Sequence, residues 1–466
     1  MSVIPRVTAS DTVRDRLALG AAVMVAGTLI GWAATWDPTM FAGVGLAFVY
    51  GALFVGAFQR TVLARVPSAS LRRLMLAGLA LRVPIVLSHI GIGIFLLDRK
   101  VDFFSYFGTA AAGGLELLQG EFRRFAIPEA HDIGGWLVTV LIVPVYFLLG
   151  GNLFGTFLLS AVIGFLGGVL FLRAYQLEFD SPTDERFFAR CLFFYPSLAF
   201  WSSLLGKDSW VFFFLGLATY GLARFIERPG GGPALSLCLG TGFMLIIRPP
   251  IGAAMCVAIV AAGLIASRDW TNQLRGAAAI LKPVAFIVLT TLILGGSYYS
   301  VIGPLQKYGI FGETASPVQG LLNVAVERHV GLSSDPSAAG SSLKARIETP
   351  TTLEALKYLP EALLTFLFRP HIFEAHNMLA MVAALDSTGL LLIVLWRFRH
   401  LLGVLRHIRT RPLVLFALLC FTLFTAGLSF EANFGAIVRH RIMVMPFLFM
   451  LLAVPLRASR QPGGSP

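Results

Sequence analysis

The strongest constraint on this chain is a series of apolar runs, each close in length to a helix that crosses a membrane. Such a helix needs about 20 mainly apolar residues, with a range of roughly 17 to 25. The runs cover residues 17–36, 40–58, 74–97, 136–149, 152–172, 189–205, 209–226, 234–247, 250–266, 281–298, 377–396, 412–429 and 442–456. Because 136–149 and 234–247 are short, we expect an all-α, polytopic transmembrane helical bundle of about 12 spans (roughly 11 to 13).

Composition agrees with lipid as the main solvent. The chain is 56% hydrophobic and 13% charged, whereas soluble domains carry about 25% charged residues. The net charge of +12 would favour a nucleic-acid partner in a soluble protein. Here the arginines gather in short segments between apolar runs, so we exclude nucleic acid. The cysteines lie inside apolar runs without metal-ligand spacing, and we interpret them as small buried hydrophobic residues: Cys191, Cys238, Cys256 and Cys420.

The arginine-rich segments predict the orientation, because cytoplasmic loops of membrane proteins carry an excess of Lys and Arg. Two such segments contain no acidic residue and are expected in the cytoplasm, with both termini: Arg60, Arg65, Arg72 and Arg73 in the first, and Arg397, Arg399, Arg406, Arg409 and Arg411 in the second. A first outer loop, 98–135, and a long outer loop, 299–376, then lie outside. We expect one integral membrane domain, 1–466, in the cytoplasmic (inner) membrane, with interfacial helices around 320–330 and 353–368.

The number of crossings leaves two alternatives open. An even number of spans must join the two outer loops, but seven candidates lie between them. If 136–149 is re-entrant, Lys207, Asp208 and Arg248 face outward. If 234–266 is instead one broken span, Lys207 and Asp208 turn inward and Arg248 lies at membrane depth.

Asp102 and Tyr106 stand out in the first outer loop. They are four residues apart, which places a carboxylate and a phenol on one face of a helix. A carboxylate just outside the bilayer suits a general base that removes the proton of a sugar hydroxyl. The simpler alternative is a solvated Asp102 that pairs with Arg99 or Lys100.

Charged residues also interrupt the apolar runs, where they are costly and usually functional. Lys207 and Asp208 do so between two runs, and the alternative is a surface turn in which Asp208 caps the next helix. Arg248, before two prolines, breaks another apolar stretch. Arg82 lies inside the run 74–97, where a long side chain can reach the cytoplasmic interface.

A polar group gathers at the end of the long outer loop. Arg369, His371, Glu374 and His376 lie where the chain returns to the membrane. His371 and Glu374 are three residues apart, which invites a metal interpretation, but no third ligand follows at metal-site spacing. The sequence therefore requires no cofactor and gives a divalent metal no support.

Arg439, His440 and Arg441 form a compact cationic group at the outer start of the last span. Guanidinium groups match phosphate oxygens in geometry and stay charged. A phosphate or pyrophosphate headgroup is the natural ligand. The alternatives are ordinary lipid-headgroup contact or a salt bridge to Glu431.

This order of features resembles the GT-C superfamily of polytopic glycosyltransferases and the related polysaccharide polymerases of bacterial envelope and exopolysaccharide clusters. The residues that carry the resemblance are Asp102 with Tyr106, the segment Phe200-Trp-Ser-Ser to Lys207-Asp208, Phe368-Arg-Pro370, and Arg439-His-Arg441 with Pro446. It implies a polyprenyl-phosphate sugar as donor and Asp102 as the base. No Asp-Glu or Asp-X-Asp pattern accompanies Asp102, which departs from the family.

We therefore expect a membrane glycosyltransferase that moves a sugar or glycan from a polyprenyl (pyro)phosphate carrier at the outer face, in cell-envelope or exopolysaccharide synthesis. The alternatives are an O-antigen-type polymerase, a transporter or flippase of lipid-linked glycans, or a structural subunit. The expected partners are the polyprenyl-linked sugar, the bilayer and other polysaccharide-assembly proteins. Beside the catalytic Asp102, the expected substrate-binding residues are Tyr106, Lys207, Asp208, Arg248, Arg369, His371, Glu374, Arg439 and Arg441.

Overall fold

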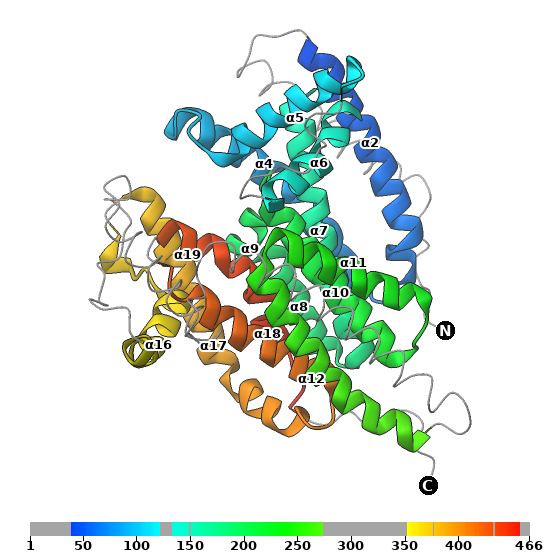
Figure 1. The fold of residues 1–466 in the computed structure, drawn as a ribbon, viewed down its shortest axis with the longest axis vertical. Coiled ribbons are helices and arrows are strands. Elements are labelled where there is room, and N and C mark those ends of the chain that lie inside the picture. Colours follow the sequence, from blue (N-terminus) through cyan, green and yellow to red (C-terminus); the bar gives the residue numbers. More distant parts are fainter. Residues whose placement is uncertain are drawn as a thin grey trace, which may run out of the picture. The chain divides into compact units, whose positions relative to one another are not determined.

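The computed structural model describes residues 39–121, 133–148, 151–273, 352–375, 377–431 and 434–456. Every regular element in these ranges is helical, which confirms the all-α fold class for the described chain (Figure 1). The chain divides into two compact units. Unit 1 contains residues 1–165 and 202–210, and unit 2 contains 166–201 and 211–466. The predicted spans 17–36 and 281–298 and the expected helix at 320–330 lie outside the described residues.

Helices able to cross a membrane are present in the described chain. Five are long and apolar enough: Ala69–Leu96, Leu153–Glu178, Lys207–Glu227, Pro249–Ala266 and Met378–His407. A sixth span arises if the bent pair Phe434–Met443 and Met445–Leu452, which turns by 57°, crosses as one. Three further apolar helices are shorter: Ile133–Tyr146, Gly231–Ile247 and Pro412–Leu428. These helices support a multi-pass membrane protein, and the full set of about 12 spans stays a prediction.

Unit 1 is built from the N-terminal helices and the segment 202–210. Its elements are α2 (Thr39–Thr61), η1 (Leu63–Arg65), α3 (Ala69–Ala80), α4 (Arg82–Gly91), the π-helical turn η2 (Ile92–Leu96), α5 (Asp102–Leu118), α6 (Ile133–Leu148) and the first half of α7 (Leu153–Glu178). Ser68 starts α3 by accepting a hydrogen bond from the backbone N–H of Leu71 at 3.3 Å. The ring of Phe157 packs on Phe103, with centroids 5.0 Å apart, and α5 packs on α6.

Unit 2 contains the second half of α7 and the later helices. Its elements are α8 (Pro182–Phe194), α9 (Pro196–Trp201), α10 (Lys207–Glu227, from Val211 on), α11 (Gly231–Ile247), α12 (Pro249–Gln273), α16 (Thr352–Phe368), η6 (Ile372–Glu374), α17 (Met378–His407), α18 (Pro412–Leu428), α19 (Phe434–His440), η7 (Arg441–Met443) and α20 (Met445–Leu452). The core of the unit is α20, which is buried along its whole length and packs against α8, α17 and α18.

Two predicted spans are divided in the structure. The run 189–205 forms the end of α8 and then α9, with a break at Tyr195, because the residue before Pro196 is disfavoured in the helical conformation. The run 442–456 begins with a short 3-10 turn and bends at Val444 before α20. In contrast, the break predicted at Arg248 is confirmed: α11 ends at Ile247 and α12 starts with Pro249, which fits the first turn of a helix.

Glycines let the helices of unit 2 approach one another closely. A Cβ added at Gly216 of α10 would lie 2.5 Å from the carbonyl oxygen of Gly167 in α7, and one at Gly240 of α11 would lie 2.5 Å from the backbone nitrogen of Ala218 in α10. Close backbone packing of this kind stabilises helix pairs in lipid, where burying larger apolar side chains brings no hydrophobic gain.

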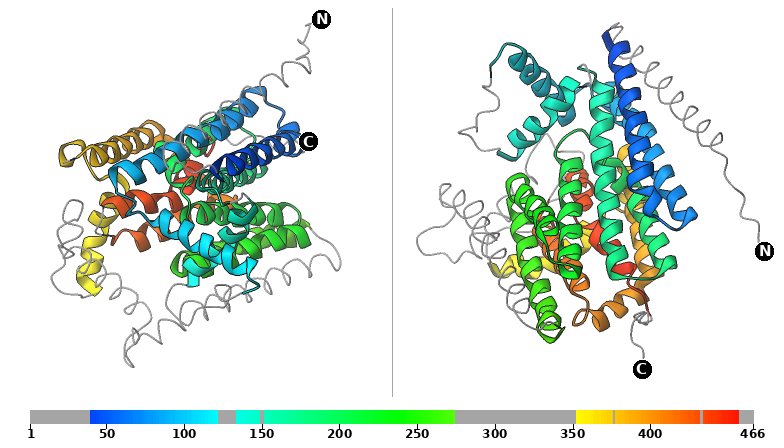
Figure 2. Two further views of the ribbon diagram at one scale, coloured as in Figure 1. Left: turned by 90° about the horizontal axis from the view of Figure 1, so that it is seen from above. Right: turned by 90° about the vertical axis from the view of Figure 1, so that its right-hand side faces the viewer.

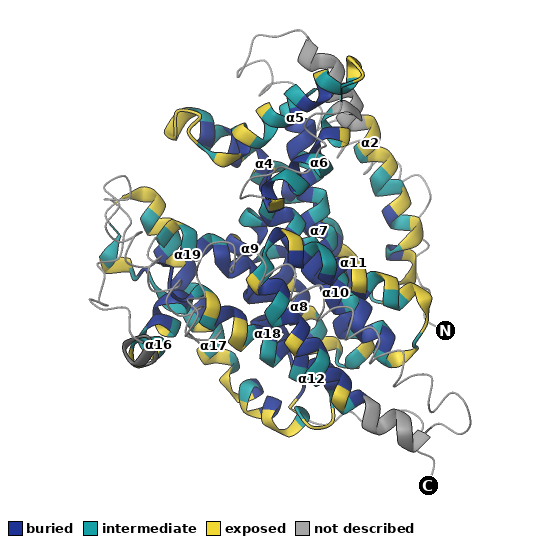
Figure 3. Ribbon diagram, in the orientation of Figure 1, coloured by how far each residue is buried: buried dark blue, intermediate teal, exposed yellow. Residues whose placement is uncertain are grey.

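The long helix α17 (light orange in Figure 2) presents a buried and an exposed face (Figure 3). Ala384, Asp386, Ser387 and Leu390 are buried against the rest of unit 2. The other face exposes large apolar side chains, which is the arrangement expected for a helix that faces lipid: Val382, Leu385, Leu392, Leu395, Trp396 and Leu402.

Candidate functional site

The residues expected to bind substrate fall into two groups, one in each unit. Asp102, Tyr106, Lys207 and Asp208 belong to unit 1. The other six, from three separate stretches of sequence, gather in unit 2 around the ends of α11, α16 and α19 and the start of α17. The centre of the second group is the arginine cluster, which we define as Arg248, Arg369, Arg439 and Arg441.

Arg441 is fully buried and donates hydrogen bonds to three acceptors. Its Nε donates to the carbonyl oxygen of Phe366 at 2.7 Å, its Nη1 to the hydroxyl of Ser387 at 2.8 Å, and its Nη2 to the carbonyl oxygen of Arg369. These carbonyls lie at the C-terminal end of α16, where helix carbonyls lack intrahelical partners. Arg441 therefore caps the C-terminal end of α16 and links it to α17.

Arg369 is paired with Glu374. Its Nε lies 3.0 and 3.2 Å from the two carboxylate oxygens, and one of them also accepts the backbone N–H of His371 at 2.8 Å. Partial burial raises the pKa of Glu374, but the hydrogen bonds from Arg369 and His371 outweigh it, so the pKa lies below its ordinary value. The guanidinium of Arg369 also lies 5.5 Å from the ring centroid of Phe434 in α19.

Arg248 reaches α19 through a histidine. Its Nη2 lies 3.3 Å from Nε2 of His440, and on the other side Nδ1 of His440 lies 3.5 Å from the carboxylate of Glu431. His440 and Glu431 are both buried. In the cationic group His440 is thus the residue that lies beside Glu431, and its contact with Arg248 connects the turn between α11 and α12 to α19.

Arg439 lies over an aromatic ring. Its guanidinium is 5.8 Å from the ring centroid of Trp201, the last residue of α9, and Trp201 packs edge-on against Phe200. The side chain of Arg439 is only partly buried. A guanidinium on an aromatic face keeps its positive charge, so the partly exposed Arg439 is suited to contact an anionic group.

The unit 1 group is centred on Gly206. Asp102 and Tyr106 both lie on α5, so their spacing of four residues is one helical turn, and Asp102 is exposed in the first turn. Lys100 pairs with Asp98 at 3.7 Å. The ring of Tyr106 packs on Gly206, where a Cβ would lie 3.1 Å from the ring and φ is +149°, so glycine is required on two grounds. Asp208, in the first turn of α10, is 1% exposed.

Arg82 is held inside unit 1 instead of extending to a membrane surface. It is fully buried, and its Nη1 donates to the hydroxyls of Ser202 and Ser203 at 2.6 and 2.8 Å. These serines begin the segment that leads to Lys207 and Asp208. The two hydroxyls supply acceptors for Nη1 inside the unit.

Metal binding finds no support in the described ranges. No group of three or more His, Cys, Asp or Glu side chains there is arranged to hold a metal ion. Glu374, one of the two residues considered as ligands, is engaged by Arg369 and by the backbone of His371.

Sequence reasoning missed Asp386 and Ser387. Both lie inside the apolar run 377–396, and both are buried beside Arg441 and the N-terminus of α9. The signal that could have identified this position is a lone carboxylate within an apolar run, because ionisable residues in spans usually face a partner inside the bundle.

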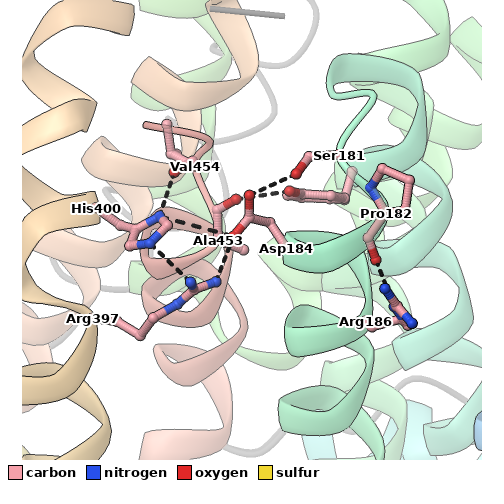
Figure 4. Close-up of polar contacts among 9 residues, drawn as sticks. Ser181, Pro182, Asp184, Arg186, Arg397, His400, Ala453 and Val454 are labelled. Carbon is pink, nitrogen blue, oxygen red and sulfur yellow. Dashed lines mark hydrogen bonds and ion pairs between the residues drawn. The ribbon is translucent and has the colours of Figure 1, made fainter. Parts of the chain in front are cut away.

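A second polar cluster lies around Asp184 (Figure 4). The carboxylate of Asp184 accepts from Nη2 of Arg397 at 2.6 Å and from the hydroxyl of Ser181 at 2.6 Å. His400 lies between Arg397 and the backbone: its Nε2 is 2.8 Å from Arg397 and its Nδ1 is 2.7 Å from the carbonyl oxygen of Val454. This cluster fixes α8, α17 and the chain after α20 to one another.

The chain matches no protein-family model, and comparison with curated proteins and with solved structures found no significant similarity.

Proposed function

We propose that this protein is a membrane-bound glycosyltransferase that takes a sugar or glycan from a polyprenyl (pyro)phosphate carrier at the outer face of the cytoplasmic membrane. The observation that supports this function is the arginine cluster. Four arginines from three separate stretches of sequence lie in one helical unit, in which α17 exposes large apolar side chains on one face. A lipid-linked phosphate needs both features, since its prenyl chain stays in lipid and its phosphate needs guanidinium donors.

The contacts within the cluster suggest a division of roles. Arg441 binds backbone and hydroxyl oxygens and builds the site. Arg369 carries a carboxylate partner, Glu374, which lies next to His371. We assign the phosphate to Arg439 because its side chain is partly exposed at the ring of Trp201, with Arg248 beside His440 as the second cation.

The chemical step assigned here is an ordinary glycosyl transfer. The acceptor hydroxyl forms a bond to the anomeric carbon, the bond from that carbon to the phosphate oxygen breaks, and the phosphate leaves with the electron pair. Asp102 takes the proton of the hydroxyl. Tyr106, Lys207 and Asp208 are assigned to the acceptor, because the ring of Tyr106 packs on Gly206 at the start of this segment.

Phosphate recognition is tested by binding. The full-length protein in lipid nanodiscs is titrated with a polyprenyl monophosphate and with the uncharged polyprenol of equal length. We expect at least about tenfold tighter binding of the phosphate, lost in Arg439→Ala, because a charged hydrogen-bonded pair contributes that much. The matched control is Arg228→Ala, an exposed arginine paired with Glu227 at the end of α10. Equal affinity for both lipids would refute phosphate binding.

Catalysis is tested separately, since base and cluster belong to different units. Asp102→Asn and Arg439→Ala variants, expressed at normal levels, are expected to lose glycan synthesis. Full synthesis in both variants would refute the transferase. Phosphate-dependent binding combined with lipid-linked glycan movement in proteoliposomes, without a new glycosidic bond, would identify a flippase instead.

A further inference from the structure

Asp386 is the one carboxylate of α17, and it lies in the apolar part of the helix. It is 8% exposed and faces the interior of unit 2. A charged group at this depth is costly unless other groups compensate it. Its surroundings therefore indicate what it does.

Two hydrogen bonds connect Asp386 to the N-terminus of α9. Its Oδ1 accepts the backbone N–H of Ser197 at 3.0 Å, and its backbone carbonyl accepts the hydroxyl of Tyr195 at 2.6 Å. The first N–H groups of a helix have no intrahelical partner, so an acceptor from another helix satisfies one of them. Because Tyr195 and Ser197 flank Pro196, both ends of the break between α8 and α9 are held by one residue of α17.

The next residue faces the arginine cluster. Ser387 accepts from Arg441 and lies 3.2 Å from the carbonyl oxygen of Arg369. The guanidinium of Arg441 also interacts electrostatically with the carboxylate of Asp386. The dipeptide Asp386-Ser387 thus joins α9 on one side to Arg441 on the other.

The far end of α9 carries Trp201, whose ring lies beneath Arg439. This helix has only six residues, Pro196–Trp201. A helix of fewer than two turns has little stability of its own, so its position depends on the contacts at its ends.

We propose that Asp386 is a positioning residue of the arginine cluster: by fixing the start of α9, it holds Trp201 against Arg439. The functional consequence, weaker phosphate binding when Asp386 is lost, rests on the proposed function. The positional consequence, a displaced Trp201, does not.

The experiment uses the full-length protein in nanodiscs with 5-fluorotryptophan incorporated, and the fluorine resonance of Trp201 is assigned with Trp201→Phe. Asp386→Ala removes the carboxylate, and with it the acceptor for the N–H of Ser197 and the negative charge. Asp386→Asn keeps an oxygen acceptor for Ser197. Tyr195→Phe removes only the hydroxyl bond. The matched control is Thr388→Ala, because the hydroxyl of Thr388 donates within its own helix, to the carbonyl oxygen of Ala384 at 2.8 Å.

We expect the Trp201 resonance to shift clearly in Asp386→Ala, less in Asp386→Asn and Tyr195→Phe, and not in Thr388→Ala. Affinity for polyprenyl monophosphate is expected to fall by about tenfold in Asp386→Ala, with partial rescue in Asp386→Asn. A role confined to stability would lower the unfolding temperature and leave the resonance of the folded protein unchanged.

An unmoved Trp201 resonance in folded Asp386→Ala overturns the inference. If that variant does not fold, an unmoved resonance in both Asp386→Asn and Tyr195→Phe overturns it equally. If the wild-type protein does not distinguish phosphate from polyprenol, the proposed function fails, and the Trp201 resonance still decides whether Asp386 positions α9.

Discussion

Arg441 and Arg411 each bind carbonyl oxygens at the C-terminal end of a helix. Arg441 does so at the end of α16, and Nη1 of Arg411 donates to the carbonyl of Glu178, the last residue of α7, at 2.7 Å. The last carbonyls of a helix lack partners and carry the negative end of its dipole. A guanidinium with several donors satisfies them and closes the helix end inside a low-dielectric environment.

Arg441→Lys tests this role at the residue scale. A single ammonium cannot reach the carbonyls of Phe366 and Arg369 and the hydroxyl of Ser387 together. We expect a loss of about 2 kcal/mol in stability, because buried acceptors lose their donors. Thermal unfolding in nanodiscs measures it, with Arg406→Lys on the exposed face of α17 as control. Equal unfolding temperatures for the two variants would contradict the role.

The pair Arg369–Glu374 predicts a pH dependence. The pKa of Glu374 is lowered in the folded protein, so its contribution to stability is complete above the ordinary glutamate value of about 4.3 and is lost as the pH falls through the lower folded value. We expect the unfolding temperature to fall in this acid range, and to fall less in Glu374→Gln. The control is Glu227→Gln, at the exposed end of α10. The same acid dependence in wild type and Glu374→Gln would exclude this contribution.

Helices could be predicted where the length of an apolar run or the position of a proline sets their bounds. The apolar run 209–226 corresponds to α10, and the expected interfacial helix at 353–368 corresponds to α16. The division of 189–205 at Tyr195 was not foreseen, although Pro196 marks it. The length of an apolar run predicts that a helix forms. The break between α8 and α9 also depends on contacts with another helix, here those that Asp386 makes with Tyr195 and Ser197.

The packing of α10 against α11 gives a prediction at the element scale. Gly240→Ala places a Cβ 2.5 Å from the backbone of Ala218, so the helices must separate and stability must fall. Gly242→Ala, two residues along the same helix, has nothing within 4 Å of its Cβ and is expected to be neutral or slightly stabilising. Unfolding temperatures of the two variants measure the difference. Equal effects of both variants would rule out close packing at Gly240.

At the scale of the whole molecule, the two polar clusters of unit 2 lie toward opposite ends of α17. This helix of 30 residues extends over roughly 45 Å, more than the hydrocarbon core of a bilayer. Arg369 and Glu374 precede its start, whereas Arg397 and His400 lie in its second half. The alternative in which 136–149 is re-entrant places Asp184 on the same face as Arg397, and Arg248 on the same face as His440. The contacts within each pair are compatible with it, and the topology stays a prediction.

The packing of α11 against α12 agrees with this alternative. Two consecutive helices that contact each other form a hairpin with Arg248 at its turn. A single broken span over 234–266 would instead place 173–188 and 397–411 on opposite faces, although Asp184 and Arg397 are in contact.

Single cysteines in a cysteine-free background test this topology. We expect Asp180→Cys and Arg406→Cys to react with an impermeant thiol reagent only after permeabilisation, and Pro250→Cys and Phe373→Cys in intact cells, because the predicted topology places the two clusters on opposite faces. All four positions are exposed. Labelling of residue 180 together with residue 373 would refute the arrangement.

The sequence by itself determined that the described chain is helical and that its helices suit a lipid environment. The length of an apolar run and the position of a proline set these properties without contacts from distant segments. The sequence also selected the arginines of the cluster by type and spacing. Only the tertiary structure decided their partners: Glu374 for Arg369, helix carbonyls for Arg441 and His440 for Arg248. These partners, and Asp386 among them, depend on contacts between distant segments, which no local pattern encodes.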